Sequence, residues 1–393
     1  MKKLTSLLLL LALLPSCRKP LFDHPPRDSF RGGDSVSRSQ EQGDSPGPPA
    51  PEPPAVLQTA LCYADTAAWR AGGSTPERIL LFKNGALAAE YPACGKTSDP
   101  ERHRLHAGHL WEDVTNGFET VIYRDGEEFL RFPGEERMQG FLCLDGTVHS
   151  LGQRPGRGIC YRIDGKEVFS DEGGVALGWA SDPEWPGGAL MEDGGKVYFT
   201  YSIGEEYRVM CGDKLLKTIP PSSGVHDVRV LDSVIYSLEK RKDGMYLVRD
   251  GKAFLLGTVV AAKQHLVAID GKMMMKSLFS SDRWGRCWMR DEKTTYYDQQ
   301  FKRGVAIFQA GGGEKAWALL DGENCILEVW KNDSLVEVPP ETYRLSLDRC
   351  ALFREGIFAL ALTADSGDGH CLLIDGKQIP VRFNGFFTGT YIE

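Results

Sequence analysis

Ile79-Leu80-Leu81-Phe82-Lys83-Asn84-Gly85 is the stretch that decides the fold, because it recurs in altered form through most of this 393-residue chain. It reads as an apolar strand, a basic residue and a turn made of Asn and Gly. A two-residue hairpin needs positive φ at its centre, which Asn, Asp and Gly tolerate and β-branched residues do not. The stretch therefore predicts a tight β-hairpin whose turn fixes the register of its strands.

The same turn pattern occurs eight times, at intervals of about 40 residues, close to the period of four short strands and their connections. The turns are Asn84-Gly85, Asp125-Gly126, Asp164-Gly165, Gly212-Asp213, Asp250-Gly251, Asp291-Glu292, Asn332-Asp333 and Asp375-Gly376. Helical periodicity is almost absent. The sequence predicts an all-β chain that closes into a β-propeller of about eight four-stranded blades. Seven blades is the alternative, because one unit can be split across the ring closure.

Further apolar stretches supply the inner strands of each unit. Residues 141–144 precede Asp145-Gly146, and residues 266–269 precede Asp270-Gly271, so both predict a second hairpin. The last segment, residues 385–392, follows the final hairpin and is expected to add a closing strand to the first blade. Radial stacking covers both faces of each sheet, which favours a propeller over an open solenoid.

Composition and charge are those of a folded protein that does not bind nucleic acid. Hydrophobic residues make up 42% and charged residues 25%, which is enough for a sizeable core. The net charge is −8, and the folded part offers one short basic run, Lys240-Arg241-Lys242. Clustered phosphate contacts are therefore not expected.

The first residues predict a lipoprotein signal peptide over residues 1–16. Met1-Lys2-Lys3 supplies a positive head, and the apolar run that follows is too short for a permanent membrane span. Leu14-Pro15-Ser16-Cys17 resembles the bacterial lipobox, although Pro15 departs from the usual residue. This resemblance implies that Cys17 carries the lipid and begins the mature chain. An ordinary secretory signal cut elsewhere is the alternative.

The lipid on Cys17 is expected to anchor the chain to a membrane, because several acyl chains together bind firmly. Arg18 follows it, which the sorting rule for such proteins associates with the outer membrane, on its periplasmic or cell-surface side. Residues 17–55 are rich in Pro, Ser and Gly and predict a flexible tether. The propeller is then expected to span residues 56–393.

The repeat resembles that of uncharacterised propeller lipoproteins from Bacteroides-like bacteria. The shared pattern, aromatic-Lys-Asn-Gly, occurs as Phe82-Lys83-Asn84-Gly85 and, with Asp last, as Trp330-Lys331-Asn332-Asp333. The resemblance covers most of residues 56–393. Its motif is structural and implies no catalytic residue.

Nine cysteines remain besides Cys17, so at least one thiol has no partner within the chain. Cys160, Cys287 and Cys371 share one register in non-neighbouring units, where they are expected to be too far apart to bridge. Cys62 with Cys94, or Cys325 with Cys350, can pair only if folding brings them close. We expect mostly free, buried thiols.

Motifs for metal binding are weak. The spacing of His103, His106 and His109 sends His106 to the opposite face of a strand, which favours a surface strand or loop. Residues 365–369 carry acidic oxygens and glycines but lack the downstream Glu of a calcium loop. The sequence predicts no metal and no cofactor.

Catalytic motifs are equally weak. Asp182, Glu184 and Glu205 are interpreted as loop residues rather than as a glycosidase pair. His226 beside Asp227 is interpreted as the start of a strand, because no Gly-x-Ser-x-Gly elbow occurs.

Four tryptophans are the candidate ligand-binding residues: Trp111, Trp179, Trp185 and Trp284. Aromatic side chains at the mouth of a ring can stack on sugars or anchor a protein partner, although packing between blades is the favoured role for any one of them. Trp185 lies in a predicted insertion over residues 180–188, in the widest interval between turns. The sequence favours a non-enzymatic scaffold that binds a protein or glycan. A glycan hydrolase or lyase with its site at the ring axis is the alternative.

Overall fold

The computed structural model describes most of the chain from residue 54 onward. The described residues are 54–64, 67, 75–94, 103–115, 119–133, 136–177, 189–220, 224–257, 263–280, 285–301, 305–311, 313–320, 325–336, 343–346, 348–364 and 369–393. The predicted signal peptide, Cys17 and the tether up to residue 53 lie outside them, so those expectations stay predictions. Within the described ranges, no helix has the length and apolar character needed to cross a membrane.

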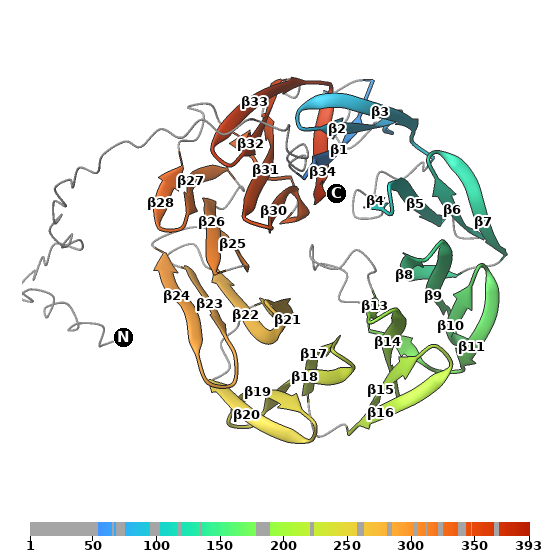
Figure 1. Ribbon diagram of the computed structural model, residues 1–393. Coiled ribbons are helices and arrows are strands. Elements are labelled where there is room, and N and C mark those ends of the chain that lie inside the picture. Colours follow the sequence, from blue (N-terminus) through green and yellow to red (C-terminus); the bar gives the residue numbers. More distant parts are fainter. Residues whose placement is uncertain are drawn as a thin grey trace, which may run out of the picture. The chain divides into compact units, whose positions relative to one another are not determined.

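Eight antiparallel sheets form a ring within residues 53–393 (Figure 1). In each sheet one edge strand lies at the axis of the ring and the other at its rim. The all-β propeller prediction is confirmed, and the number of blades is eight rather than seven. We number the blades 1 to 8 along the chain.

The strands fall into four concentric layers. From blade 1 to blade 8, the innermost strands are β34 (Gly385–Ile392), β4 (His103–His106), β8 (Arg137–Leu144), β12 (Val175–Ala176) with β13 (Leu190–Asp193), β17 (Gly224–Leu231), β21 (Lys263–Ile269), β25 (Val305–Gly311), and β29 (Tyr343–Arg344) with β30 (Ala351–Arg354). The second strands are β1 (Val56–Cys62), β5 (His109–Thr115), β9 (Thr147–Arg154), β14 (Lys196–Ile203), β18 (Val234–Arg241), β22 (Lys272–Ser280), β26 (Glu314–Leu320) and β31 (Ile357–Ala364).

The outer two layers hold the hairpins named by the turn pattern. The third strands are β2 (Arg78–Lys83), β6 (Glu119–Arg124), β10 (Gly158–Ile163), β15 (Glu206–Cys211), β19 (Gly244–Arg249), β23 (Gly285–Arg290), β27 (Ile326–Lys331) and β32 (Gly369–Ile374). The outermost strands are β3 (Ala86–Pro92), β7 (Glu127–Pro133), β11 (Lys166–Asp171), β16 (Lys214–Ile219), β20 (Lys252–Gly257), β24 (Thr295–Phe301), β28 (Ser334–Val336) and β33 (Lys377–Arg382).

The ring is closed by the C-terminal strand, as the sequence predicts. Strand β34 pairs antiparallel with β1, from Val56 opposite Ile392 to Cys62 opposite Gly385. Blade 1 therefore takes one strand from the end of the domain and three from its beginning. The Oγ1 atoms of Thr388 and Thr59 add a buried hydrogen bond of 3.0 Å across this pair.

The outer turns adopt the backbone that their residues predict. In six of them both central residues have positive φ, as at Asn84 (48°) and Gly85 (87°). The turn at Gly212 has positive φ at its glycine. The remaining one, at Asp291, is a longer loop in which the Asp291 carboxylate accepts hydrogen bonds from the backbone N–H groups of Lys293 and Thr294.

The first turn residue also ties its hairpin to the second strand. In blade 3 the backbone N–H of Asp164 donates to the carbonyl of Val148, and the N–H of Val148 donates to Asp164 Oδ1, both at 2.8 Å. The same reciprocal pair, which we call the turn clamp, recurs in four further blades: Asn84 with Val56, Asp125 with Leu110, Asn332 with Lys315, and Asp375 with Phe358. Gly212 donates its N–H to Val197 at 3.1 Å but has no side chain to accept in return.

The two faces of the ring differ in their connections. Turns from the first to the second strand and from the third to the fourth lie on one face, which we call the turn face. From one strand to the next, these turns are two residues long except at 291–294. The connections from the second to the third strand, and from one blade to the next, begin and end at strand ends on the opposite loop face. Between these strand ends they vary from two residues, as at 204–205, to fifteen, at 63–77.

Apolar side chains pack between neighbouring blades rather than within one. One cluster joins blades 2 and 3 through Trp111, Phe132 and Phe141. Another joins blades 3 and 4 through stacked rings of Tyr161 and Phe199, 5.0 Å apart. Because each sheet is covered on both faces by its neighbours, the blades depend on one another for burial.

The turn clamp predicts a stability difference between two aspartates of blade 3. Asp164 and Asp145 both have positive φ, 46° and 49°, but Asp164 forms the clamp whereas Asp145 is an exposed residue of the inner turn. Asp164→Gly should lower the free energy of unfolding by about 1–3 kcal/mol more than Asp145→Gly, because it leaves the buried N–H of Val148 without an acceptor. Urea denaturation of both variants measures the difference.

Asp164→Asn is the matched control, because Asn keeps the accepting oxygen and occurs naturally at Asn84. It should retain most of the stability that Asp164→Gly loses. Equal losses for the two glycine variants would show that the clamp contributes nothing.

Candidate functional site

The strongest candidate site surrounds the ring axis, where strands from all eight blades meet. Neighbouring innermost strands lie against one another, as β13 does against β8 and β17, and β34 against β30 and β4. Residues at their loop-face ends therefore form a ring around one end of the axis. We call this end of the axis the axial mouth.

Blade 4 contributes an interrupted innermost strand to the wall of the axis. β12 pairs with β14 near its loop-face end, and β13 pairs with the same strand from Phe199 to Lys196. The chain leaves the sheet at Leu177, whose N–H donates to Thr200 at 3.1 Å, and returns at Ala189. The segment between these residues, which includes the predicted insertion, thus begins and ends at the wall of the axis.

Blade 8 is interrupted in the same way, four blades further round the ring. β29 pairs with β31 at Thr363 and Ala364, and β30 pairs with it at residues 357–360. Between them lies η2 (Asp348–Cys350), a short 3-10 helix. Two interrupted strands therefore face each other across the axis.

Arg349 of η2 joins three blades at the axis. Its Nε donates to the carbonyl of Thr388 in blade 1, and its Nη1 donates to the carbonyl of His103 in blade 2 at 3.1 Å. Both acceptors are neutral, and no carboxylate of the described residues pairs with this guanidinium. Arg349 is half-buried, and its Nη2 is a buried atom without a hydrogen-bond partner among the described residues.

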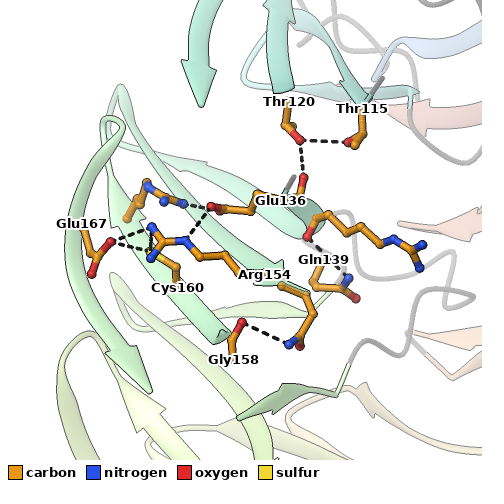
Figure 2. Close-up of polar contacts among 11 residues, drawn as sticks. Thr115, Thr120, Glu136, Gln139, Arg154, Gly158, Cys160 and Glu167 are labelled. Carbon is orange, nitrogen blue, oxygen red and sulfur yellow. Dashed lines mark hydrogen bonds and ion pairs between the residues drawn. The ribbon is translucent and has the colours of Figure 1, made fainter. Parts of the chain in front are cut away.

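A buried carboxylate organises the entry into blade 3. Glu136 is 2% exposed and immediately precedes β8; it pairs with Arg162 and with Arg154, the latter at 3.2 Å (Figure 2). The backbone carbonyl of Glu136 accepts a hydrogen bond from Thr120 of blade 2. A Cβ at Gly152 would overlap the Glu136 carboxylate, so the absence of a side chain there makes room for it.

The network continues outward to Cys160 and Glu167 (Figure 2). Arg154 Nη2 donates to Glu167 Oε2 at 2.7 Å and to Cys160 Sγ at 3.3 Å, and the thiol donates to the same carboxylate oxygen at 3.2 Å. Burial is the main cause that raises the pKa of Cys160 to about 12. The thiol is therefore protonated at neutral pH and is not a nucleophile. This cluster joins strands rather than performing chemistry.

Next to this cluster, the loop-face end of β8 carries the polar residues Arg137 and Gln139. Arg137 follows Glu136, is exposed and has no ion-pair partner among the described residues. The Gln139 side-chain amide donates to the Arg137 carbonyl at 3.5 Å, and the Gln139 carbonyl accepts from the N–H of Ala189 at 3.1 Å. The return point of the blade 4 interruption is thus bonded to the strand that carries Arg137.

Blade 5 adds His226 and Lys240 at its loop-face end. His226 is the extra residue of a bulge in β17, between Val225 and Asp227. Burial first, and the positive charge of Lys240 second, lower the pKa of His226 from its ordinary value. Lys240 is exposed, and within the described residues no carboxylate pairs with it. The positive charge at this end of blade 5 is therefore that of Lys240, because a lowered pKa favours the neutral form of His226.

Of the four candidate tryptophans, the structure describes Trp111 alone. Its side chain is 1% exposed, its Nε1 donates to the His106 carbonyl at 3.1 Å, and its ring meets Phe129 edge-on at 5.3 Å. This places Trp111 in the core between blades 2 and 3, where the ring has no face open to a ligand. Trp179, Trp185 and Trp284 lie outside the described residues.

The three closely spaced histidines are brought into one hairpin but not to one site. His103 lies opposite Glu112 with Nε2 3.2 Å from Oε1, His106 contacts the Cys143 carbonyl, and His109 pairs with Asp125 at 2.6 Å. The sequence placed them on the surface, whereas His103 is 2% exposed because blade 1 covers its strand. In the described ranges, no group of three His, Cys, Asp or Glu side chains is arranged to hold a metal ion.

The other acidic and histidine candidates do not converge either. Glu205 is exposed in the two-residue connection between β14 and β15. Asp227 is buried beside Arg229, and its Oδ2 accepts a hydrogen bond of 2.7 Å from the backbone of Leu266. Asp182, Glu184 and residues 365–368 lie outside the described part of the chain.

The eight described cysteines carry thiols and form no disulfide, including Cys62, Cys94, Cys325 and Cys350. Cys160 and Cys371 lie on the third strands of blades 3 and 8 and are both buried, as their shared register predicts. The side chain of Cys287 lies outside the described residues.

The described domain is an eight-bladed β-propeller of mostly four-stranded blades. No protein-family model matches the sequence, and no curated protein matches it. Among solved structures, the chain is similar to the dihydro-heme d1 dehydrogenase NirN in complex with DHE, with 8% identity, a TM-score of 0.54, and coverage of 86% of this chain and 74% of that one.

Two further similarities are more distant. Apo AztD from Citrobacter koseri is 12% identical, with a TM-score of 0.48 and coverage of 86% of this chain and 98% of the other. A protein of unknown function from Bacteroides caccae is 10% identical, with a TM-score of 0.28 and coverage of 69% and 84%. At 8% identity, the similarity to NirN shows the fold alone and nothing about activity.

The buried network around Glu136 predicts a large loss on truncation. Glu136→Ala should lower the free energy of unfolding by about 3–5 kcal/mol, because it leaves Arg162 charged and buried without its partner. Glu136→Gln keeps the shape and one acceptor and should cost less. The matched control, Glu167→Gln, removes a partly exposed partner of Arg154 and should cost about 1 kcal/mol or less. This assignment would be contradicted if urea denaturation showed a larger loss of unfolding free energy for Glu167→Gln than for Glu136→Ala.

The stability of the protein should depend on pH in part through the Glu167 carboxylate. Hydrogen bonds from Arg154, Cys160 and Ser170, in that order, lower the pKa of its carboxylate from 4.5 to about 2. A carboxylate with a depressed folded-state pKa stabilises the fold above its unfolded pKa, and this contribution is lost as pH falls from 4.5 towards 2. Thermal melts of wild type and Glu167→Gln should therefore converge across that window. A difference in melting temperature between wild type and Glu167→Gln that stays constant from pH 6 to pH 2 would contradict the pairing of Glu167 with Arg154.

Proposed function

We propose that this protein is a lipoprotein of the cell envelope whose propeller acts as a non-enzymatic scaffold that binds a protein or glycan at the axial mouth. The observation that carries the binding role is the interruption of two innermost strands on opposite sides of the axis. Ordinary blades need no such interruption, and the connections on a rigid scaffold are where binding residues tend to lie.

The chemistry of the described residues supports binding rather than catalysis. Glu136 and Asp227, two carboxylates at the loop-face ends of innermost strands, are buried and held by arginines, so neither is placed to transfer a proton to a ligand. The described cysteine thiols with the largest shifts, Cys94 and Cys160, have pKa values raised to about 12, mainly by burial. A thiol with such a pKa is a poor nucleophile at neutral pH.

The location rests on the sequence of residues 1–17. The apolar run and the lipobox-like Leu14-Pro15-Ser16-Cys17 support lipid attachment at Cys17 and, with Arg18, the outer membrane. A tether over residues 17–55 would let the propeller reach ligands away from the bilayer. The resemblance of the repeats to Bacteroides-type propeller lipoproteins supports the same proposal.

One variant tests both parts of the proposal. The full chain with Cys17→Ser should no longer incorporate radiolabelled palmitate and should leave the membrane fraction, whereas wild type stays with it. The released chain, applied to glycan and peptide arrays, should bind a restricted set of ligands. Membrane association of the variant equal to wild type would contradict the anchor. Turnover of a polysaccharide without array binding would contradict the scaffold and favour a hydrolase or lyase.

A further inference from the structure

The outermost strand of each blade has an outer edge with which no other described strand pairs. Unpaired N–H and C=O groups along such an edge can bind another strand, and proteins prevent this with bulges, charged side chains, prolines or short strands. Seven of the eight outermost strands carry such a feature in their central part. The exception is β20 of blade 5, at the rim of the ring (Figure 1).

Bulges interrupt five of the other edges close to the turn. The extra residues are Ala88, Phe129, Val168, Leu216 and Tyr296. Beyond its bulge, each of these five strands carries a charged side chain: Glu90, Arg131, Asp171, Lys217 and Asp298. Of the two remaining strands, β28 is three residues long and β33 contains Pro380.

The central part of β20 is regular and uncharged. The first four residues of β20 pair in register with β19, and the extra residue, Leu256, follows them. Ala253-Phe254-Leu255 contains no charge and no proline. The Leu255 side chain is 52% exposed, and Ala253 is exposed as well. A regular, uncharged edge with an exposed leucine is the type that pairs with another strand.

The backbone groups of Ala253 and Leu255 point away from the blade. The two-residue turn before β20 has positive φ at both positions, 50° and 74°, which places Lys252 in a hydrogen-bonded pair with Arg249. Backbone groups alternate in direction along an antiparallel ladder, so the second and fourth residues of β20 face outward. Pro380, the fourth residue of β33, fits this alternation, because proline is tolerated where the N–H would face solvent.

We propose that β20 pairs with β20 of a second copy of this chain, antiparallel and across a twofold axis. In the register that follows, Ala253 lies opposite the second copy's Leu255, and the outward groups of both strands meet. About four hydrogen bonds then join the two copies. Each leucine packs beside an alanine, and the two Phe254 side chains lie in the closer, non-hydrogen-bonded type of pair.

Charge favours a second copy as the occupant. The uncharged edge suits an equally uncharged strand, and the antiparallel register puts the two Lys252 side chains at opposite ends of the pair. Arg249, which lies over the Phe254 ring at 6.0 Å, is already paired with Glu292 at 3.0 Å. The segment before residue 54 suits the edge poorly, because it is rich in proline, which cannot donate to a ladder.

The pairing goes beyond the proposed function, because it concerns the rim rather than the axial mouth. It is small beside the roughly 1,200 Å² that stable complexes bury, so we expect a weak dimer that forms where copies are concentrated. Two paired copies would carry two binding domains and so could bind a repeated ligand by avidity.

Disulfide trapping in cells that produce the full chain tests the pairing. Phe254→Cys should form a covalent dimer under a mild oxidant, because the two Cβ atoms of such a pair lie about 4.5–5.5 Å apart. The matched control, Leu216→Cys, occupies the same third position of β16 but on a bulge. Leu216 is 42% exposed and Phe254 is half-buried, so random collision favours the control. Phe254→Cys should nevertheless give at least about tenfold more dimer.

A proline separates edge pairing from other contacts. Leu255→Pro, added to the Phe254→Cys chain, removes one outward N–H without breaking the β19–β20 ladder, as Pro380 does in blade 8. It should reduce the dimer to the level of the control with an unchanged thermal melt. Ala253→Lys adds a charge to the edge and should have the same effect, which keeps the test valid if the proline variant does not fold. Leu255→Thr keeps the N–H and should retain the dimer.

Three results would overturn the inference. Equal dimer yields from Phe254→Cys and Leu216→Cys, including none from either, would leave no specific pairing. A dimer that survives both Leu255→Pro and Ala253→Lys would place the contact elsewhere. A covalent product of Phe254→Cys with a different protein, identified by mass spectrometry, would give the edge another occupant. None of these results bears on array binding by the released chain, so the proposed function stands or falls separately.

Discussion

The structure depends on the turn clamp, in which one side chain sets a turn and also attaches it to the rest of the blade. At Asn84 or Asp164, a short polar side chain tolerates positive φ, and its oxygen accepts the N–H of a second-strand residue. The outer hairpin is thereby fixed in register against the inner strands. Because blades cover each other's faces, a register error in one blade would misplace the apolar side chains of two interfaces.

Closure of the ring also depends on hydrogen bonds that attach one element to another. β34 completes blade 1, and Arg349 lies over it, with hydrogen bonds to blade 1 at Thr388 and to blade 2 at His103. The partners Arg349 and His103 are 246 residues apart in sequence. Contacts of this range form late and at high entropic cost, so the ring is stable only when the apolar interfaces form with them.

Sequence reasoning succeeded where the cause is local. The turn residues Asn84-Gly85 and their recurrences predict the hairpins, their count gives eight blades, and residues 385–392 supply the closing strand. It failed where burial is decided by another blade. His103 was expected at the surface because the spacing of nearby histidines carries no information about blade 1. Trp111 has the favoured role, packing between blades, but its strand has the same alternation whether the ring faces a neighbour or a ligand.

The polar residues of the candidate site could not be predicted from the sequence, for a related reason. Glu136 and Arg162 are 26 residues apart, and nothing in either local sequence shows that one lies at the entry to a blade and the other on its third strand. Arg137 and Lys240 look like ordinary surface cations until the layers of the ring are known. One usable signal existed: the widest interval between turns marks the interrupted strand of blade 4.

The contrast between the two faces explains how a rigid ring can carry a variable site. On the turn face, two-residue turns clamped by Asn and Asp leave no room for insertions without loss of register. The loop face has no such constraint, and both interrupted strands lie in the innermost layer of their blades. Selection on binding can therefore act on the axial mouth while the clamps preserve the blades.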